Sequence, residues 1–236
     1  MSRFLSPNCH SCPSRQSPLL GSCLLEELEF IATTKSAQFY HKGQVIYQQG
    51  SPVLGMHCVH QGKVKLAKVG GDGKEHITQL ARHGDVLGFR ALLSGGQYTT
   101  SAVALDDCVV CFIPRPDVLR LIQSNRQFAN SLLQLLATGL GEAEEQLLRL
   151  AYKPVRERLA EALLLVRRTF DSAAGPGEPF TLTLSREDLA ALVGTAKETV
   201  SRLLTEYKEA GIIATRGSHI RLLQEDQLLA ISTRYE

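Results

Sequence analysis

The sequence predicts an α+β protein with a β-barrel in its first half, a long helix in its middle and a winged helix-turn-helix at its end. Three observations carry this prediction. Glycines punctuate short apolar runs through residues 24–115, which is typical of a sandwich or barrel. Leucines then recur at helical spacing. Two short helical patterns joined by a glycine come last, followed by a hairpin pattern.

Length and composition set the outer limits. The chain has 236 residues, 44% of them hydrophobic, which is enough for packed cores and excludes wholesale disorder. No apolar run reaches the roughly 18–20 residues of a membrane helix, and no secretory signal is visible, so we expect a cytoplasmic protein without a membrane partner. The six cysteines are then expected to be metal ligands, redox groups or buried small residues rather than disulfides. A net charge of +2 neither favours nor excludes a nucleic-acid partner.

The chain divides into four segments. Residues 1–23 are rich in Ser, Pro and Cys and are expected to form an irregular arm. Residues 24–115 begin with a short helix and continue as strands. Residues 116–152 have helical periodicity, and residues 153–236 form a second domain.

The middle segment contains an apolar seam. Six residues are spaced 3, 4, 3, 4 and 3 apart: Leu133, Leu136, Leu140, Ala143, Leu147 and Leu150. This heptad-like spacing fits one face of a helix packed on its own domain, or a parallel helix pair between two subunits. The stripe is narrower than a helix on a globular core usually shows, which favours a homodimer. Ala143 brings no charge to the seam, so we expect a dimer that persists in the apoprotein.

The last domain contains the most informative motif. Ser185 is a good N-cap, and Asp188 three residues later completes a box-like pattern. Gly194 can take the positive φ of a tight turn between helices. Thr195 is then expected to cap a second helix that runs to about Glu209. The pair is typical of a helix-turn-helix.

The second helix has two faces. Its apolar residues follow an i, i+3, i+4, i+7 pattern and should be buried: Val200, Leu203, Leu204 and Tyr207. The opposite face carries Lys197, Glu198, Ser201 and Arg202. Arg can donate to guanine and Glu can accept from cytosine, and the N-terminal turns of such a helix meet base edges in the major groove. Alternatively, Glu198 closes a capping box with Thr195, or pairs with Arg202 on a solvated face.

Elements on both sides of this motif complete a winged arrangement. Upstream, we expect a helix over 154–170, a loop over 171–177 and a strand over 180–184. Downstream, residues 212–222 fit a β-hairpin with its turn at Gly217 and Ser218. Arg216 or His219 at the tip of the wing can then touch a DNA phosphate.

A barrel, a long helix and a winged helix-turn-helix in this order resemble the CRP/FNR family of transcription regulators. The resemblance covers residues 24–232 and is most specific in LAALVGTAKETVSRLLTEYKEAGII, over residues 189–213. It implies a jelly-roll barrel like a cyclic-nucleotide-binding domain, no enzyme activity, and double-stranded DNA and RNA polymerase as partners. Residues 197–202 look like the FNR-type reading helix, which implies a palindrome near TTGAT and ATCAA.

The resemblance also bears on the signal. The cyclic-nucleotide branch binds its phosphate with a Glu and an Arg from one cassette, and here Phe89 and Tyr98 occupy those two positions. A buried phosphate needs a paired cation or several donors, so we expect no cAMP. The neighbouring Arg90 either serves another anion or is a solvated or ion-paired side chain.

The cysteines point to a different cofactor. Cys9 and Cys12 form a C-x2-C pair, Cys23 follows after ten residues, and Cys111 falls where the FNR branch has its barrel ligand. The resemblance therefore implies a [4Fe–4S] cluster on these four thiolates, and with it oxygen or redox sensing. The loop from Cys12 to Cys23 is longer than the commoner spacings. Zinc, reversible thiol oxidation, NO chemistry and a small-molecule effector remain alternatives.

The other two cysteines are expected to be structural. Cys58 and Cys108 lie in strand-like segments and read as buried small residues. Cys108 and Cys111 should point to opposite faces of one strand. An enzyme on a cupin-like barrel is disfavoured, because the histidines form no tight H-x-H pair and no Ser/His/Asp arrangement is visible.

Overall fold

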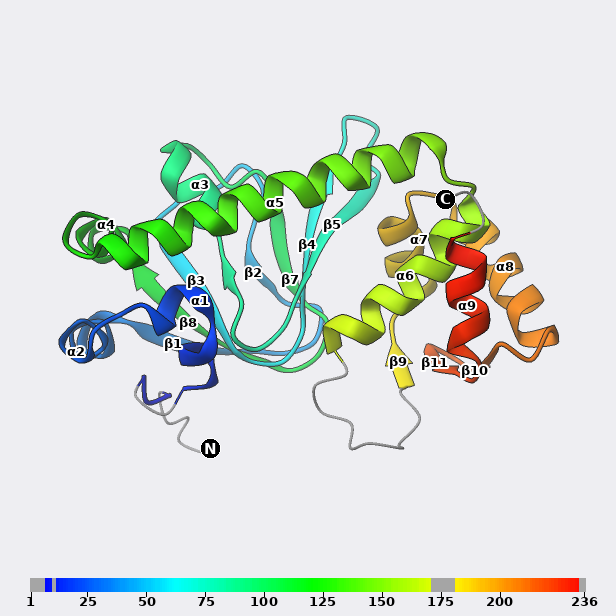
Figure 1. The fold of residues 1–236 in the computed structure, drawn as a ribbon, viewed down its shortest axis with the longest axis horizontal. Coiled ribbons are helices and arrows are strands. Elements are labelled where there is room, and N and C mark those ends of the chain that lie inside the picture. The colour runs from blue at the N-terminus through cyan, green and yellow to red at the C-terminus, as the bar shows by residue number, and fades with distance from the viewer. Residues whose placement is uncertain (1–6, 10–11, 171–180, 234–236) are drawn as a thin grey trace. The chain divides into compact units, whose positions relative to one another are not determined.

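The computed structural model describes residues 7–9, 12–170 and 181–233 (Figure 1). The predicted loop over 171–177 and the first residue of the predicted strand, Phe180, lie outside the described residues. The chain forms two compact units. The first comprises the chain up to Val69 together with Gln79–Glu142, and the second comprises Gly70–Thr78 together with the chain from Ala143 onward.

Two four-stranded antiparallel sheets form the predicted barrel. One sheet has the order β1-β8-β3-β6 and consists of β1 (Ser36–Tyr40), β8 (Cys108–Pro114), β3 (Gly55–Gln61) and β6 (Val86–Leu87). The other has the order β2-β7-β4-β5 and consists of β2 (Val45–Tyr47), β7 (Ser101–Ala104), β4 (Val64–Val69) and β5 (Glu75–Ala81). The chain thus crosses repeatedly from one sheet to the other, which confirms the predicted jelly-roll class.

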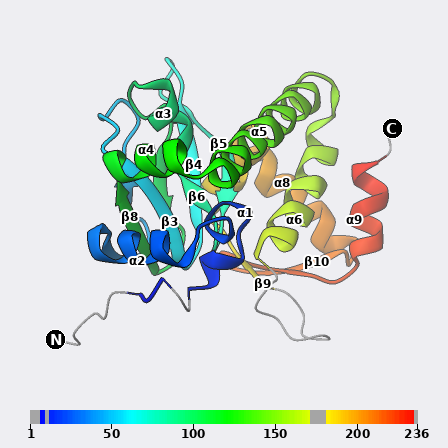
Figure 2. The same cartoon turned by 60° about the vertical axis from the view of Figure 1, so that its left-hand side comes forward.

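Three helices accompany the barrel: α2 (Leu25–Thr34), α3 (Phe89–Ser94) and α4 (Arg115–Ser124). Helix α2 packs on β8 and α4, and α4 packs on β3 (Figures 1 and 2). The prediction of a short helix near residues 24–33 is confirmed. The core beneath these helices includes the fully buried side chains of Met56, Ile113 and Phe128.

The prediction of an irregular arm over residues 1–23 is wrong from Pro13 onward. A 3-10 helix, η1 (Pro13–Gln16), is followed by a one-turn helix, α1 (Pro18–Gly21). Proline suits the first position of a helix because its missing N–H would lack a partner there. Leu19 and Leu20 are buried in the barrel core, so burial of two leucines holds this segment on the barrel.

The predicted helical segment over 116–152 contains two helices, α4 and α5 (Arg126–Tyr152). Between them Asn125 has an extended backbone, with φ −120° and ψ 102°. Its Oδ1 accepts a hydrogen bond from the N–H of Phe128 at 2.9 Å and so caps the first turn of α5. Its Nδ2 donates to Ser22 O at 3.0 Å and to Glu27 Oε2 at 2.6 Å.

The second unit holds four helices and a small sheet. The helices are α6 (Val155–Phe170), α7 (Arg186–Val193), α8 (Lys197–Glu209) and α9 (Glu225–Ser232), and α6 packs against the other three (Figure 1). The sheet has the order β10-β11-β9 and consists of β10 (Ile213–Arg216), β11 (His219–Leu222) and β9 (Thr181–Thr183). The winged helix-turn-helix is thereby confirmed; α9 has no counterpart in the predicted elements. None of the described helices combines the length and apolar character that crossing a membrane requires.

Candidate DNA-reading helix and cysteine pocket

The first helix of the motif begins as predicted. The hydroxyl of Ser185 accepts a hydrogen bond from the N–H of Asp188 at 2.9 Å and donates to its carboxylate at 2.7 Å. Gly194 ends the helix with φ 71°, in the left-handed region that favours glycine. The turn between the two helices therefore has the geometry that the sequence indicates.

The predicted capping role of Thr195 is wrong. The N-cap of α8 is Ala196, which makes no side-chain hydrogen bond, and the helix begins at Lys197. The N–H of Thr195 donates to Ala190 O at 3.1 Å, so this residue closes the preceding helix. The capping-box pattern S/T-x-x-E requires Thr195 to be the N-cap. Because α8 begins one residue later, Glu198 cannot close a capping box with Thr195.

The two faces of α8 are arranged as predicted. Val200, Leu203, Leu204 and Tyr207 are buried. Lys197, Glu198 and Arg202 are exposed, and Ser201 is half-buried. The first two turns thus present two cations, an anion and a hydroxyl on one surface, a set of groups that can contact base edges and phosphates.

Acidic neighbours engage both cations of this surface. Lys197 forms an ion pair with Glu187 of α7, which raises the pKa of the lysine and lowers that of the glutamate. Arg202 Nη1 donates to Glu206 Oε1 at 2.5 Å, one turn further along α8. The expected alternative of a Glu198–Arg202 pair is therefore replaced by a pair with Glu206. Both ion pairs are exposed, so DNA phosphates and bases can compete for the cations.

The wing ends in the predicted turn. Gly217 has φ 60°, and Arg216 and His219 are paired partners at the end of the hairpin. Both side chains are exposed. His219 Nδ1 lies 3.1 Å from Thr183 Oγ1 on β9. Arg216 is therefore available for a phosphate contact at the tip of the wing.

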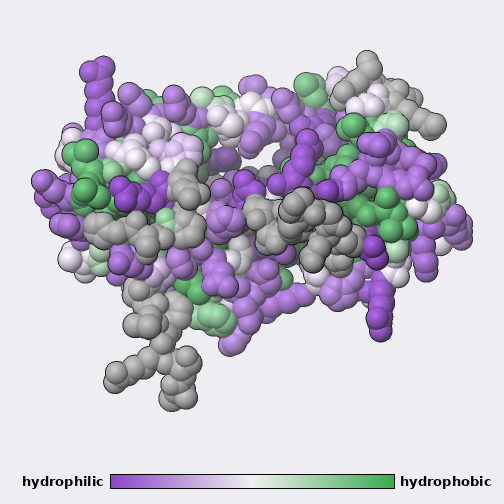
Figure 3. All heavy atoms as spheres, turned by 60° about the horizontal axis from the view of Figure 1, so that its bottom comes forward, coloured by the Kyte–Doolittle hydropathy of each residue, from purple (hydrophilic) through white to green (hydrophobic). Residues whose placement is uncertain are grey.

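The seam residues lie on an exposed face of α5. The exposed fractions are 62% for Leu133, 63% for Leu140 and 69% for Leu147. Ala143 is also exposed, and Leu136 is half-buried. A repeated row of exposed leucines on one helix forms an apolar surface of the kind that marks a protein–protein interface. Figure 3, which brings the lower side of Figure 1 forward, shows a mostly hydrophilic face with hydrophobic side chains in separate small patches.

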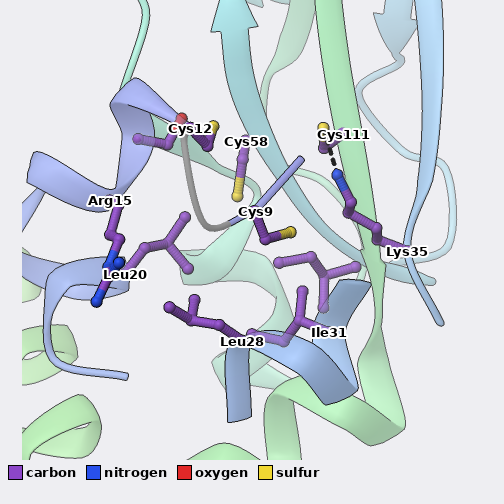
Figure 4. A pocket seen from close by; sticks show the side chains of 11 residues that line it. Cys9, Cys12, Arg15, Leu20, Leu28, Ile31, Lys35, Cys58 and Cys111 are labelled. Carbon is purple, nitrogen blue, oxygen red and sulfur yellow. Dashed lines mark hydrogen bonds between the residues drawn. The ribbon is translucent and has the colours of Figure 1, made fainter. Parts of the chain in front are cut away.

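A pocket beside the N-terminal segment, residues 7–9 and 12–21, brings four cysteines together (Figure 4). Cys9 and Cys12 come from that segment, Cys58 from β3 and Cys111 from β8. Cys23 is also buried, but it is not among the residues that line the pocket.

Polar contacts hold the N-terminal segment at this pocket. Cys12 Sγ lies 3.2 Å from His60 Nδ1. Burial, and secondly the charge of Lys35, lower the pKa of His60, so the imidazole is neutral and its Nδ1 can accept a hydrogen bond from the thiol. Lys35 Nζ lies 3.8 Å from Cys111 Sγ (Figure 4) and also donates to the carbonyl oxygen of Pro7.

Burial controls the protonation of these thiols. It raises the pKa of Cys58 well above 9.0, and the thiols of Cys111, Cys12 and Cys9 raise it further. Burial also raises the pKa of Cys111, while Lys35 opposes the increase. Burial and Glu27 raise the pKa of Cys23 to about 12. Burial therefore favours the protonated form of Cys58 and Cys111, and metal binding would displace those protons.

The donor set fits an iron–sulfur cluster by its chemistry. Four cysteine sulfurs are the usual ligands of such a cluster. Across residues 7–9, 12–170 and 181–233, no three His, Cys, Asp or Glu side chains are arranged to hold a single metal ion.

The two cysteines expected to be structural differ from each other. Cys108 is fully buried, and its thiol donates to the carbonyl oxygens of Lys63 and Asp106, each at 3.2 Å. It does not line the pocket, so the prediction that it points away from Cys111 is confirmed. Cys58 is buried as predicted, but against the other pocket thiols. Sequence reasoning missed this placement because only strand pairing reveals it.

Aromatic rings fill the part of the barrel near the phosphate cassette. Tyr98 stacks on Tyr47 with ring centroids 4.0 Å apart, and its hydroxyl donates to Gly55 O at 3.2 Å. His57 lies beside Tyr47, at a centroid distance of 5.2 Å. Phe89 is buried as well. The two positions that would bind a cyclic phosphate thus contribute apolar surface instead of a charge pair.

Arg90 is accounted for by a helix contact. Its guanidinium lies against Gly139 of α5, where an added Cβ would sit 2.2 Å from Nη2. Only glycine fits this approach without displacing the arginine. Arg90 is exposed, which agrees with the expected solvated side chain, and the packing on Gly139 is an additional contact that the sequence did not predict.

A jelly-roll barrel, a helix with an exposed leucine row and a winged helix-turn-helix define a DNA-binding regulator with a separate sensing domain. Residues 37–125 match the cyclic nucleotide-binding domain family, and residues 157–231 match the Crp-like helix-turn-helix domain family. The Cyclic AMP receptor protein of Thermus thermophilus is 34% identical over 197 residues, which are 84% of this chain and 88% of that protein. The chain belongs to the CRP/FNR family of transcription regulators, whose members are not enzymes.

Relatives from the FNR branch cover more of the chain. The Fumarate and nitrate reduction regulatory protein of Vibrio cholerae is 27% identical over 228 residues, 95% of this chain and 90% of that protein. Among solved structures, FixK2 from Bradyrhizobium japonicum has a TM-score of 0.74 at 28% identity and covers 86% of this chain and all of its own. A CRP/FNR-family transcriptional regulator from Thermus thermophilus has a TM-score of 0.72 at 27% identity, covering 85% of this chain and 100% of its own.

Proposed function

We propose that this DNA-binding transcription regulator senses oxygen or redox state through a cysteine-ligated [4Fe–4S] cluster. It acts as a homodimer on an FNR-box-like palindrome and contacts RNA polymerase there. The observation that carries the sensing proposal is the pocket in which cysteines of the N-terminal segment meet cysteines of the barrel. Relatives named for fumarate and nitrate reduction, matched over 95% of the chain, support the same branch.

Cys9, Cys12 and Cys111 supply three ligands, and a fourth thiolate completes the set. The family pattern gives that place to Cys23. A bound cluster supplies an oxidant-labile link between the N-terminal segment and the barrel. Cys12 contacts His60, and Lys35 contacts both Pro7 and Cys111. These contacts hold the ligands of the N-terminal segment close to those of the barrel before a cluster binds.

The DNA site is the exposed face of α8. Lys197, Glu198, Ser201 and Arg202 supply base and phosphate contacts, with Arg216 of the wing on a neighbouring phosphate. Thr195 lies just before the helix and is half-buried, and its N–H is bonded to Ala190 O, so its contribution is a hydroxyl contact to phosphate. The palindrome follows from the two-fold symmetry of a dimer.

The dimer forms along the exposed seam of α5. Leu133, Leu140 and Leu147 lie two helical turns apart along the seam, with Leu136, Ala143 and Leu150 between and beyond them. Burying this row against a second copy removes apolar surface from water at about 25 cal/mol per Å². This gain stabilises the parallel pair that presents two reading helices to two half-sites.

A regulator gated by cAMP is disfavoured by the aromatic cluster. Tyr98 and Phe89 are buried in the positions where the cyclic-nucleotide branch has its Arg and Glu. Placing a phosphate there would bury an anion without a paired cation. The pocket thiols are the better sensing site.

Anaerobic purification of the full-length protein tests the proposal. We expect a coloured protein whose visible absorbance bleaches in air, with iron and sulfide near a ratio of one and about four irons per protomer. Colourless protein with stoichiometric zinc would reject the cluster and leave a zinc-dependent regulator. Metal-free protein that forms intramolecular disulfides in air would leave thiol oxidation as the signal.

A further inference from the structure

Cys58 and Cys23 are competing candidates for the fourth ligand position, and their surroundings differ. Cys58 lines the pocket together with Cys9, Cys12 and Cys111 (Figure 4). Cys23 is buried in the same core without lining the pocket. A ligand must reach the space that the other three ligands share. By this criterion Cys58 is placed to bind and Cys23 is not.

The barrel presents Cys58 and Cys111 as a cross-strand pair. They are directly opposite each other in the antiparallel pairing of β3 with β8. Directly opposite residues project to the same face, with Cβ atoms about 4.5–5.5 Å apart. Both are nearly fully buried, with exposed fractions of 4% and 5%. Two adjacent strands therefore hold two thiols side by side, and both line the pocket.

The N-terminal segment is anchored next to Cys58 on the same strand. Cys12 contacts His60, two residues beyond Cys58 on β3. The hydroxyl of Ser14, a buried residue, donates to the carbonyl oxygen of Val59 at 3.4 Å. Cys12 and Ser14 thus contact the two residues that follow Cys58 on β3, which holds the C-x2-C pair beside Cys58. A ligand set built from this pair and the cross-strand pair requires no rearrangement of the barrel.

Cys23 is fixed in a turn that packs against other elements. Its N–H donates to Leu20 O at 3.3 Å. Asn125 Nδ2 donates to the carbonyl oxygen of Ser22, and the N–H of Leu24 donates to Glu27 Oε2 at 2.8 Å. Residues on both sides of Cys23 are therefore hydrogen-bonded to the start of α5 and to α2. Moving Cys23 to the pocket would break these bonds.

We infer that Cys58 is the fourth thiolate ligand, together with Cys9, Cys12 and Cys111, and that Cys23 is a structural core residue. This inference rests on the proposed cluster. It assigns two ligands to the N-terminal segment and two to the barrel, where the family pattern gives three and one. The cluster then does not have to span the long interval from Cys12 to Cys23, because Cys23 is outside the ligand set.

Anaerobic preparations of the full-length wild type and single variants test the assignment. Cys58→Ala and Cys23→Ala are compared, with Cys108→Ala as the matched control for losing a buried thiol. Iron and sulfide content and the visible spectrum are measured, and circular dichroism of each variant checks folding. We expect Cys23→Ala and Cys108→Ala to retain the wild-type iron content, and Cys58→Ala to fall from about four irons to fewer than one.

Cys58→Ser keeps the assignment testable if the alanine variant does not fold. Serine preserves the size of the side chain and offers an oxygen donor. Loss of the cluster from a folded variant, or a retained cluster with an altered electron paramagnetic resonance signal after reduction, supports Cys58 ligation. A retained cluster with an unchanged signal, or loss of iron from Cys23→Ala alone, overturns it. If the wild type itself holds no iron, the proposed function fails first, and the inference falls with it.

Discussion

Lys35 Nζ lies 3.8 Å from the sulfur of Cys111, and the same ammonium group donates to the carbonyl oxygen of Pro7. One side chain therefore links the N-terminal segment to the barrel strand at the pocket. Lys35 lowers the pKa of Cys111, against the larger effect of burial, which raises it above 9.0. The lysine thus favours the thiolate form that metal binding requires.

Replacing Lys35 by Met should slow the reaction of Cys111 with iodoacetamide in metal-free protein. Without the cation the pKa of Cys111 rises further, and well below the pKa each unit costs about tenfold in thiolate. We expect a several-fold slower rate at mildly alkaline pH, measured by mass spectrometry of the Cys111 peptide. Lys42→Met, the same change at an exposed position, serves as the control. Equal rates for the wild type and Lys35→Met would contradict this role.

The ion pair between Arg202 and Glu206 competes with DNA. Glu206→Gln should therefore tighten binding to an FNR-box duplex several-fold, measured by fluorescence anisotropy at fixed salt. Arg202→Ala and Glu198→Ala should each weaken specific binding by about 1–3 kcal/mol. In the Arg202→Ala background Glu206→Gln should have little effect, which identifies the contact by a double-mutant cycle.

Glu209→Gln provides the matched control for that experiment. It removes the same charge from the last turn of α8, further from the reading face. If Glu209→Gln tightened binding as much as Glu206→Gln, general electrostatics would explain the gain. Competition for Arg202 would then be rejected.

Leu140→Glu should convert the dimer to a monomer. Leu140 is 63% exposed in the single chain and lies in the middle of the seam, so a charge there would be buried between two copies. Light scattering during size-exclusion chromatography measures the mass. Leu148→Glu introduces the same charge at a residue that is 59% exposed and outside the seam, and should leave the dimer intact.

The seam also predicts the state of the apoprotein. Because Ala143 brings no charge to the interface, metal-free wild type should remain a dimer at micromolar concentration. A monomer of the wild type under these conditions would show that the cofactor, not the seam, holds the subunits together.

cAMP should not stabilise the protein. A ligand present at 100 times its Kd adds about 2.7 kcal/mol to the free energy of unfolding, which a thermal melt detects. Tyr98, at the position of the phosphate-binding Arg, is stacked on Tyr47 and offers no cation, so we expect no shift of Tm. The Thermus thermophilus relative named Cyclic AMP receptor protein is the positive control. A saturable increase in Tm would contradict the prediction.

Tyr207 should make the second unit sensitive to alkali. Its hydroxyl donates to Arg156 O at 2.6 Å, and burial raises its pKa from 10.0 to about 12. The folded state therefore holds this proton more tightly than the unfolded state. The stabilisation is complete below pH 10 and is lost as the pH rises towards about 12.

Tyr207→Phe should cost about 1 kcal/mol at neutral pH, because a hydrogen bond is lost. The difference in unfolding free energy between this variant and the wild type should shrink above pH 10, measured by urea titrations at several pH values. Tyr152→Phe, at a residue that is 78% exposed, should show neither effect. A difference that stays constant with pH would refute the assignment to Tyr207.

The reading helix could be predicted from sequence because local rules determine it. Gly194 has the positive φ that its position required, and the spacing of Val200, Leu203 and Tyr207 predicts the buried face. Thr195 fails as a cap because α8 begins one residue later, with Ala196 as its N-cap, while the N–H of Thr195 donates to Ala190 O of the preceding helix. The position of this helix start depends on turn geometry, which the residue types alone do not encode.

The surroundings of the cysteines depend on long-range pairing. Cys58 and Cys111 are 53 positions apart, and only the register of β3 against β8 brings them together. The helices η1 and α1 likewise depend on the barrel surface that buries Leu19 and Leu20. The spacing of apolar residues in the sequence cannot predict these two helices, because a four-residue helix is too short to show a repeat.

Asn125 turns the break between α4 and α5 into a joint. Its Oδ1 caps α5, the helix that carries the leucine row, and its Nδ2 donates to the turn that follows α1. A displacement of that turn would remove the carbonyl oxygen of Ser22, which accepts a hydrogen bond from Asn125, the residue that caps α5. The N-terminal segment can therefore influence the start of the long helix through a single side chain, with no deformation of the barrel sheets in between.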